Sequence, residues 1–149
     1  MREGPAALGF WAMAHDVRRP DSAYLSFWRE RHICTLTTPR PDGSPHVVPV
    51  GATYDPEAGL ARIITSGGSR KVANIRAAAE ADPAGARVAL CQLEGRRWAT
   101  LEGRAFIRTE PELIADAEAR YTERYQRVPR ENPQRVLIEI RLTRAMGNA

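Results

Sequence analysis

Short segments rich in valine, isoleucine and threonine, separated by turns of glycine, proline and aspartate, constrain the fold of this chain most strongly. Branched side chains pack well on a pleated surface and the turn residues end each segment, so the pattern is typical of β-strands. Pro49 and Gly51 interrupt the second segment, which indicates an edge, a bulge or a barrel corner. The pattern predicts six strands, at residues 32–38, 45–54, 60–66, 86–93, 96–108 and 134–143.

Helical patterns interrupt the strands at residues 21–31, 70–80 and 109–127. Thr109 is expected to cap the third helix and Glu112 to complete a capping box, while Pro111 suits an early helical position. Two antiparallel meanders joined by helices fit a mainly β fold with helices (α+β), in which a small barrel carries the helices outside.

The length of 149 residues suits a single domain. Residues 1–20 show no clear period, so we expect a flexible N-terminal arm there and the folded domain over residues 21–149. No apolar run approaches the roughly 20 residues that a membrane span needs, and the N-terminus lacks the order of a secretory signal. We therefore expect a cytoplasmic protein without a membrane partner.

The formal net charge is +4 and the isoelectric point is about 9.6, but the arginines are spread along the whole chain. Binding to nucleic acid would need a basic cluster, so we expect no such partner. Cys34 and Cys91 lie in apolar, strand-like segments and are expected to be buried thiols. Together with three scattered histidines they show no metal-ligand spacing, so no metal site is expected.

The most informative segment is residues 63–71, where a strand ends, a Gly-Gly pair lets the backbone turn and a helix begins near Ser69. Free N–H groups at a helix start attract anions, and Ser69, Arg70 and Lys71 add a hydroxyl and two positive charges. The segment therefore predicts a phosphate site; the alternative is that Ser69 only caps the helix and the basic residues are solvated. Lys71 is the one lysine among 22 basic residues, which favours a position that needs a compact ammonium group.

The strand at residues 45–54 is the second candidate, because Pro49 and Gly51 can bring the backbone close to a flat ring whose polar edge then bonds to main-chain groups. His46 is either structural or ligand-binding, and Trp98 either stacks on a ring or packs in the core. No nucleophile–base pair stands out, so if the protein is an enzyme a cofactor carries the reactive chemistry.

Several stretches, taken together, resemble the pyridoxamine 5′-phosphate oxidase-like split-barrel superfamily. They are Ser44–Val50, Ile64–Lys71, Cys91–Gly103, Tyr121–Tyr125 and Arg144–Gly147. Within the superfamily they are most similar to the branch of deazaflavin (coenzyme F420)-dependent reductases that includes biliverdin reductases. The resemblance covers about residues 22–147, and the chain departs from it in a longer N-terminal arm and an insertion near residues 78–85.

The resemblance implies an FMN-binding-like split β-barrel that forms a homodimer, with the cofactor at the subunit interface. It implies that coenzyme F420 binds with its phosphate and acidic tail at residues 69–71 and its ring along residues 46–50, and that Trp98 comes from the partner subunit. The cofactor-binding residues expected on this basis are His46, Val47, Val48, Pro49, Val50, Thr65, Ser66, Ser69, Arg70, Lys71 and Trp98.

In such enzymes the reduced deazaflavin gives a hydride to a small conjugated substrate, and biliverdin, reduced to bilirubin, is the substrate that the resemblance suggests. No residue is assigned a catalytic role. Two alternatives stay open, because one fold hosts many functions. One is an FMN-dependent oxidase or reductase, and the other is a non-enzymatic protein that binds haem, another tetrapyrrole or a cofactor.

Overall fold

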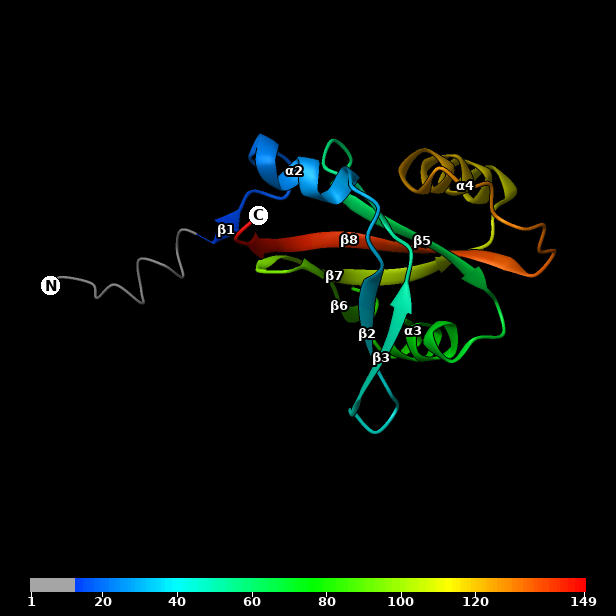
Figure 1. The fold of residues 1–149 in the computed structure, drawn as a ribbon. Helices are drawn as coiled ribbons and strands as arrows, with labels where there is room; N and C mark the ends of the chain where they lie inside the picture. The colour runs from blue at the N-terminus through cyan, green and yellow to red at the C-terminus, as the bar shows by residue number, and fades with distance from the viewer. Residues whose placement is uncertain (1–12) are drawn as a thin grey trace, which may run out of the picture.

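The computed structural model describes residues 13–149 (Figure 1). Three helices are present in this part of the chain: α2 (Ser22–Arg29), α3 (Arg70–Ala81) and α4 (Pro111–Tyr125). The strands are β1 (Ala14–His15), β2 (Cys34–Pro39), β3 (Pro45–Val50), β4 (Thr53–Asp55), β5 (Leu60–Ser66), β6 (Ala86–Glu94), β7 (Arg97–Arg108) and β8 (Arg135–Gly147). The mainly β fold with helices that the sequence predicts is confirmed.

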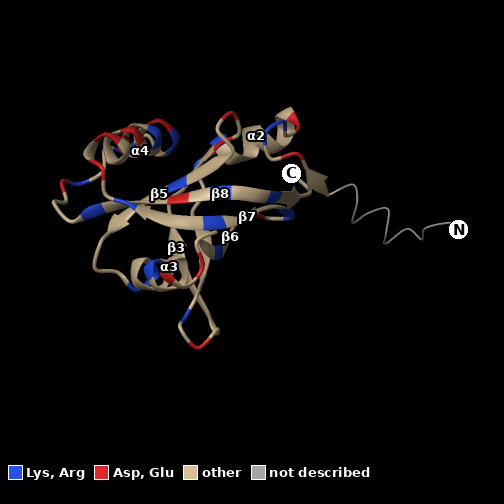
Figure 2. Cartoon of the chain, turned by 180° about the vertical axis from the view of Figure 1, so that it is seen from behind, with Lys and Arg blue, Asp and Glu red and all other residues tan. Residues whose placement is uncertain are grey.

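The strands form one antiparallel sheet in the order β3-β2-β6-β7-β8-β5-β4, and β1 adds to β8. α2 and α4 lie on one side of the long strands and α3 lies on the other, in both views of the chain (Figures 1 and 2). Acidic and basic residues are interspersed along the helices and strands (Figure 2). No helix among residues 13–149 is long and apolar enough to cross a membrane.

The prediction of one strand over residues 45–54 is wrong, because the chain changes partners within it. β3 pairs with β2 and β4 pairs with β5, so the two pieces stand at opposite ends of the sheet order, joined only by Gly51 and Ala52. At Gly51 a Cβ atom would lie 2.8 Å from Cε2 of Tyr121, so only glycine lets α4 pack this closely on the junction. Among the described strands the hydrogen-bonded ladder is therefore not closed into a barrel.

The pairing register of the strands explains which side chains form the core. Leu36, Leu90, Leu101 and Ala145 face one another across four strands, and each is at most 1% exposed. The same core cluster includes side chains from α2 and α3, namely Tyr24, Phe27, Trp28, Val72 and Ile75. The neighbouring row faces outward and includes Cys91, which is only half-buried, so the prediction of two buried thiols holds for Cys34 alone.

Element ends differ from the sequence prediction where tertiary contacts decide them. The Thr109 capping box is wrong, because α4 begins at Pro111 with Glu110 at the N-cap and no side-chain cap bond. β8 continues past residue 143 to Gly147, because its last residues pair with β1 and the Gly147 N–H donates to the Met13 carbonyl. Of the predicted N-terminal arm, residues 1–12 lie outside the described residues, and residues 13–15 contact β8 in this way.

Gly103 offers a test of the packing between β7 and β8. A register shift falls between Glu102 and Gly103, and a Cβ at Gly103 would lie 2.2 Å from the Arg141 carbonyl oxygen. Because backbone cannot yield as a side chain does, Gly103→Ala should lower the free energy of unfolding by about 2–3 kcal/mol in urea denaturation. Gly68→Ala, where a Cβ meets nothing within 4 Å, is the control and should change it by less than about 0.5 kcal/mol. Equal effects would contradict the packing argument.

Candidate functional site

The junction between β5 and α3 leaves polar groups without partners. Ser69 takes the N-cap position of α3 with φ −74° and ψ 155°, but its side chain makes no cap hydrogen bond. Its Oγ is buried and has no hydrogen-bond partner among the described residues. The first N–H groups of any helix also lack partners within the helix. The alternative in which the Ser69 hydroxyl caps its own helix is therefore not realised, and the hydroxyl is left without a partner among the described residues.

Two positive charges next to Ser69 lack a counter-ion within the described chain. Lys71 is half-buried, and burial lowers the pKa of its ammonium group. Neither Lys71 nor the exposed Arg70 takes part in any ion pair among residues 13–149. A cation that is partly desolvated and unpaired favours an anion, so the electrostatics suit a phosphate or carboxylate ligand at this point.

Two unpaired strand edges lie beside this anion site. Continuing the β4–β5 register beyond the pair Thr53–Arg62 would bring Val50 opposite Thr65, but β3 leaves at the junction and pairs with β2 instead. The remaining edge of β3 and the Thr65–Ser66 edge of β5 therefore have no strand partner among the described residues. Pro49 has no N–H to leave unsatisfied, and the Ser66 carbonyl already accepts a hydrogen bond of 3.2 Å from the Ser69 N–H. Only the remaining main-chain groups of these edges need partners from outside the sheet.

Residues 46–50 divide between the two faces of β3. Val47 is 56% exposed and Pro49 is also exposed, so both face outward, while Val50 is buried. His46 pairs with Thr38, whose Oγ1 accepts a hydrogen bond of 3.1 Å from Asn74 of α3. His46 thus faces the interior beside α3, and its Nδ1 is buried without a partner.

Trp98 is not brought to the anion site within one chain. Its side chain is half-buried on the outer face of the sheet opposite exposed Leu93, so the core alternative for Trp98 is not realised either. β8 begins opposite Ser66 and ends opposite Ala99, the neighbour of Trp98. Twelve residue steps of strand correspond to about 40 Å. Trp98 and the anion site therefore lie at opposite ends of β8.

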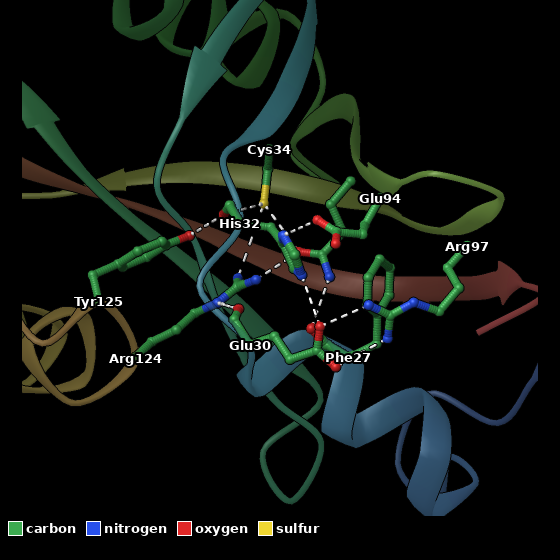
Figure 3. Close-up of polar contacts among 9 residues, drawn as sticks. Phe27, Glu30, His32, Cys34, Glu94, Arg97, Arg124 and Tyr125 are labelled. Atoms are coloured by element: carbon green, nitrogen blue, oxygen red, sulfur yellow. Dashed lines mark hydrogen bonds and ion pairs between the residues drawn. The ribbon is translucent and has the colours of Figure 1, made fainter.

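Sequence reasoning missed the buried Arg124, which organises the polar contacts in Figure 3. Arg124 is 7% exposed, and its Nε donates to the Glu30 carbonyl at 2.9 Å. Its two Nη atoms donate to the Ala52 carbonyl and to Gln92 Oε1, each at 2.6 Å. The usable signal was the seven-residue spacing from Ala117, also buried, which puts both residues on one face of α4.

At the surface end of the same cluster, Glu30 joins α2 to β7. Arg97 donates to both Glu30 carboxylate oxygens at 2.9 Å, and His32 lies 2.9 Å from Oε1. These contacts lower the pKa of Glu30 to about 2, with the Arg97 hydrogen bond as the largest cause. Figure 3 shows that the Arg97 guanidinium also stands over the ring of Phe27, 4.6 Å from its centroid.

A separate cavity of about 360 Å³ lies between α2, β4 and α4. Its lining includes Trp28, Thr53, Asp55, Arg120 and Arg124, and none of the residues that the sequence predicts for a cofactor. No cluster of three or more metal-ligating side chains occurs within residues 13–149.

The sequence profile described as "Pyridoxamine 5'-phosphate oxidase" matches residues 20–147. The chain belongs to the pyridoxamine 5′-phosphate oxidase family. The chain is also similar to the F420H(2)-dependent biliverdin reductase of Mycobacterium tuberculosis (strain CDC 1551 / Oshkosh). The two are 47% identical over 138 residues, which are 93% of this chain and 95% of the relative.

Solved structures agree on the family fold. A conserved hypothetical protein from Mycobacterium tuberculosis superposes with a TM-score of 0.67 at 25% identity, over 89% of this chain and 86% of that one. A structure titled "F420 Reductase" gives 0.63 at 23% identity, over 85% of this chain and 98% of that one. The chain therefore shares the overall fold of these solved structures.

The Glu30 contacts predict a pH-dependent contribution to the stability of this family member. A carboxyl whose pKa falls from 4.5 to about 2 on folding stabilises the fold above about pH 4.5 and loses that effect as the pH drops toward 2. Because the pair is about half-exposed and screened, Glu30→Gln should lower the free energy of unfolding by about 0.5–1 kcal/mol at pH 7. The difference from wild type should vanish near pH 2 in thermal or urea unfolding. Glu131→Gln, at an exposed position without an ion pair in the described chain, should show no pH-dependent difference; a constant gap for Glu30→Gln would contradict the assignment.

Proposed function

We propose that the protein is an F420H2-dependent reductase that delivers a hydride to a conjugated small molecule, with biliverdin, reduced to bilirubin, as the leading substrate. The observation that carries the proposal is the unpaired, half-buried Lys71 beside the free hydroxyl of Ser69. This anion site stands next to two unpaired strand edges in a chain that is 47% identical to a relative named for F420H(2) and biliverdin.

The residues at the helix start fit the anionic part of the cofactor. Ser69 donates its hydroxyl, and the first N–H groups of α3 donate to the same phosphate. Lys71 supplies the compact ammonium, and exposed Arg70 faces solvent, where it meets the acidic tail. Both charges lack internal counter-ions among the described residues, so the bound anion does not have to displace an existing ion pair.

The strand edges fit the ring. Main-chain groups on the open edge of β3 hydrogen-bond the polar rim of a flat ring, and exposed Val47 and Pro49 provide an apolar surface that excludes water. His46 and Val48 support this strand from the interior, while Thr65 and Ser66 face the ring from β5. When bound, reduced deazaflavin supplies the hydride; the residues named here bind and orient it.

We propose further that the protein is a homodimer and that the open ladder becomes a split barrel with its cofactor sites at the subunit interface. The outer face of β2, β3 and β6 carries Ile33, Val47 and Leu93, which are 66%, 56% and 66% exposed. Large apolar side chains gathered on one sheet face favour association with another protein surface. A two-fold partner also explains how Trp98, remote from Ser69 in one chain, can reach a cofactor site.

Leu93→Glu tests the dimer. A buried carboxylate at a two-fold interface appears twice and is costly, so the variant should sediment as a monomer where the wild type sediments as a dimer. Val128→Glu, at a residue 78% exposed in the loop after α4, is the matched control and should stay dimeric. A monomeric wild type, or a dimeric Leu93→Glu, would contradict this interface.

Lys71→Ala tests the cofactor site. Loss of a charge-assisted contact of about 1.5–3 kcal/mol should raise the Kd for F420, followed by its fluorescence, by about 10- to 150-fold. Arg76→Ala removes the same charge from an exposed position on the same helix and should leave the Kd within about twofold.

A parallel titration with FMN and a turnover assay with F420H2 and biliverdin complete the test. Tight F420 binding with bilirubin formation is the expected result. Tight binding of FMN alone would replace the proposal by a flavin enzyme on the same fold, and tetrapyrrole binding without turnover would replace it by a binding protein.

A further inference from the structure

The junction between β3 and β4 is held from outside by two residues of α4. The Arg124 Nη1 donates to the Ala52 carbonyl at 2.6 Å. The Tyr125 hydroxyl accepts a hydrogen bond of 3.0 Å from the Ala52 N–H and donates to the His32 carbonyl at 2.8 Å. Both main-chain groups of Ala52 are thus bonded to α4 rather than to a strand. The contacts fix the point where the chain leaves one edge of the sheet for the other.

The guanidinium of Arg124 lies in the interior and has no carboxylate partner within the described chain. Four acceptors surround its guanidinium: the Glu30 and Ala52 carbonyls, Gln92 Oε1, and Cys34 Sγ at 3.9 Å. The rings of Trp28 and Tyr125 lie 5.5 and 5.0 Å from its central carbon. Burying an unpaired charge is expensive, and a shorter apolar residue would leave the same carbonyls unsatisfied. The planar guanidinium is the group that satisfies several acceptors at once.

The same residues border the proposed ring site. Ala52 is two residues from Val50, the last residue of β3. The rings of Tyr121 and Tyr125, tilted by 36° with their centroids 4.8 Å apart, pack against Gly51 between these two residues. A shift of Ala52 would move the open edge of β3 relative to Thr65 and Ser66 on β5. The spacing of these two edges decides whether a flat ring can bond to both.

We propose that Arg124 and Tyr125 are positioning residues for the cofactor: through Ala52 they set the separation of the unpaired β3 and β5 edges. This inference rests on the proposed function, since the cofactor ring is the group whose binding depends on the separation of the two edges. Arg124 and Tyr125 touch neither cofactor nor substrate in it. They act through the backbone, so their loss weakens binding of the ring without altering the anion site at Ser69 and Lys71.

Tyr125→Phe is the variant that tests this role, because it removes one hydroxyl and keeps the ring that packs on Gly51. Tyr24→Phe is a matched control: that hydroxyl also contacts two main-chain carbonyls, of Thr100 at 3.2 Å and Met146 at 2.9 Å, and it makes no hydrogen bond to Gly51 or Ala52. Both variants should lose a similar amount of stability in urea. Tyr125→Phe should raise the Kd for F420 about fivefold, whereas Tyr24→Phe should leave it within about twofold. Equal Kd values for the two variants would overturn the proposal.

A second readout separates this inference from the proposed function. In the ligand-free protein, amide hydrogen exchange at Ala52 should be at least about tenfold faster in Tyr125→Phe than in wild type, because the acceptor of that N–H is gone. Tyr24→Phe should leave Ala52 exchange unchanged. If wild type does not bind F420, the proposed function fails and with it the cofactor role of the junction. If F420 binds to wild type but exchange at Ala52 is unchanged in Tyr125→Phe, the positioning role alone is overturned.

Discussion

Two residues, Gly51 and Ala52, carry the chain from one end of the sheet order to the other. Main-chain N–H and C=O groups need partners, and a strand that changes neighbours must leave some of them unpaired. Here α4 bonds both main-chain groups of Ala52, while the adjoining edges of β3 and β5 have no strand partner among the described residues. α3 begins directly after β5, with Ser69 at its N-cap and Lys71 in its first turn. In the proposed function, the cofactor binds where the sheet does not close.

Arg124 and Lys71 are two cations with different surroundings in the fold. Arg124 is buried and has no carboxylate partner in the described chain, yet four acceptors and two aromatic rings surround it. Lys71 is half-buried and has no such shell. The guanidinium of Arg124 has acceptors within the protein and connects α4 to Glu30, Ala52 and Gln92. Lys71 has no ion-pair partner and the Ser69 Oγ has no hydrogen-bond partner among the described residues, so the proposed function assigns both to the anion of the cofactor.

Local chemistry in the sequence was enough to predict much of this arrangement. Branched residues and the turn residues between them located most of the strands, and the Gly-Gly-Ser-Arg-Lys segment located the start of α3. Pro49 and Gly51 signalled the interruption of their strand, but not that β4 would cross to β5, because that depends on α4 packing over Gly51. The Thr109 capping box failed because the N-cap is Glu110, one residue later than the pattern suggests. Arg124 was missed because a buried arginine is recognised by its partners, which come from segments distant in sequence.

A crystal structure of the protein with bound F420 tests the central claim most directly. The account predicts that the cofactor phosphate lies within hydrogen-bond distance of Ser69 Oγ and Lys71 Nζ, with the ring between the open edges of β3 and β5 and Trp98 of the partner subunit nearby. A cofactor bound instead in the cavity between α2, β4 and α4, lined by Trp28 and Thr53, would contradict it.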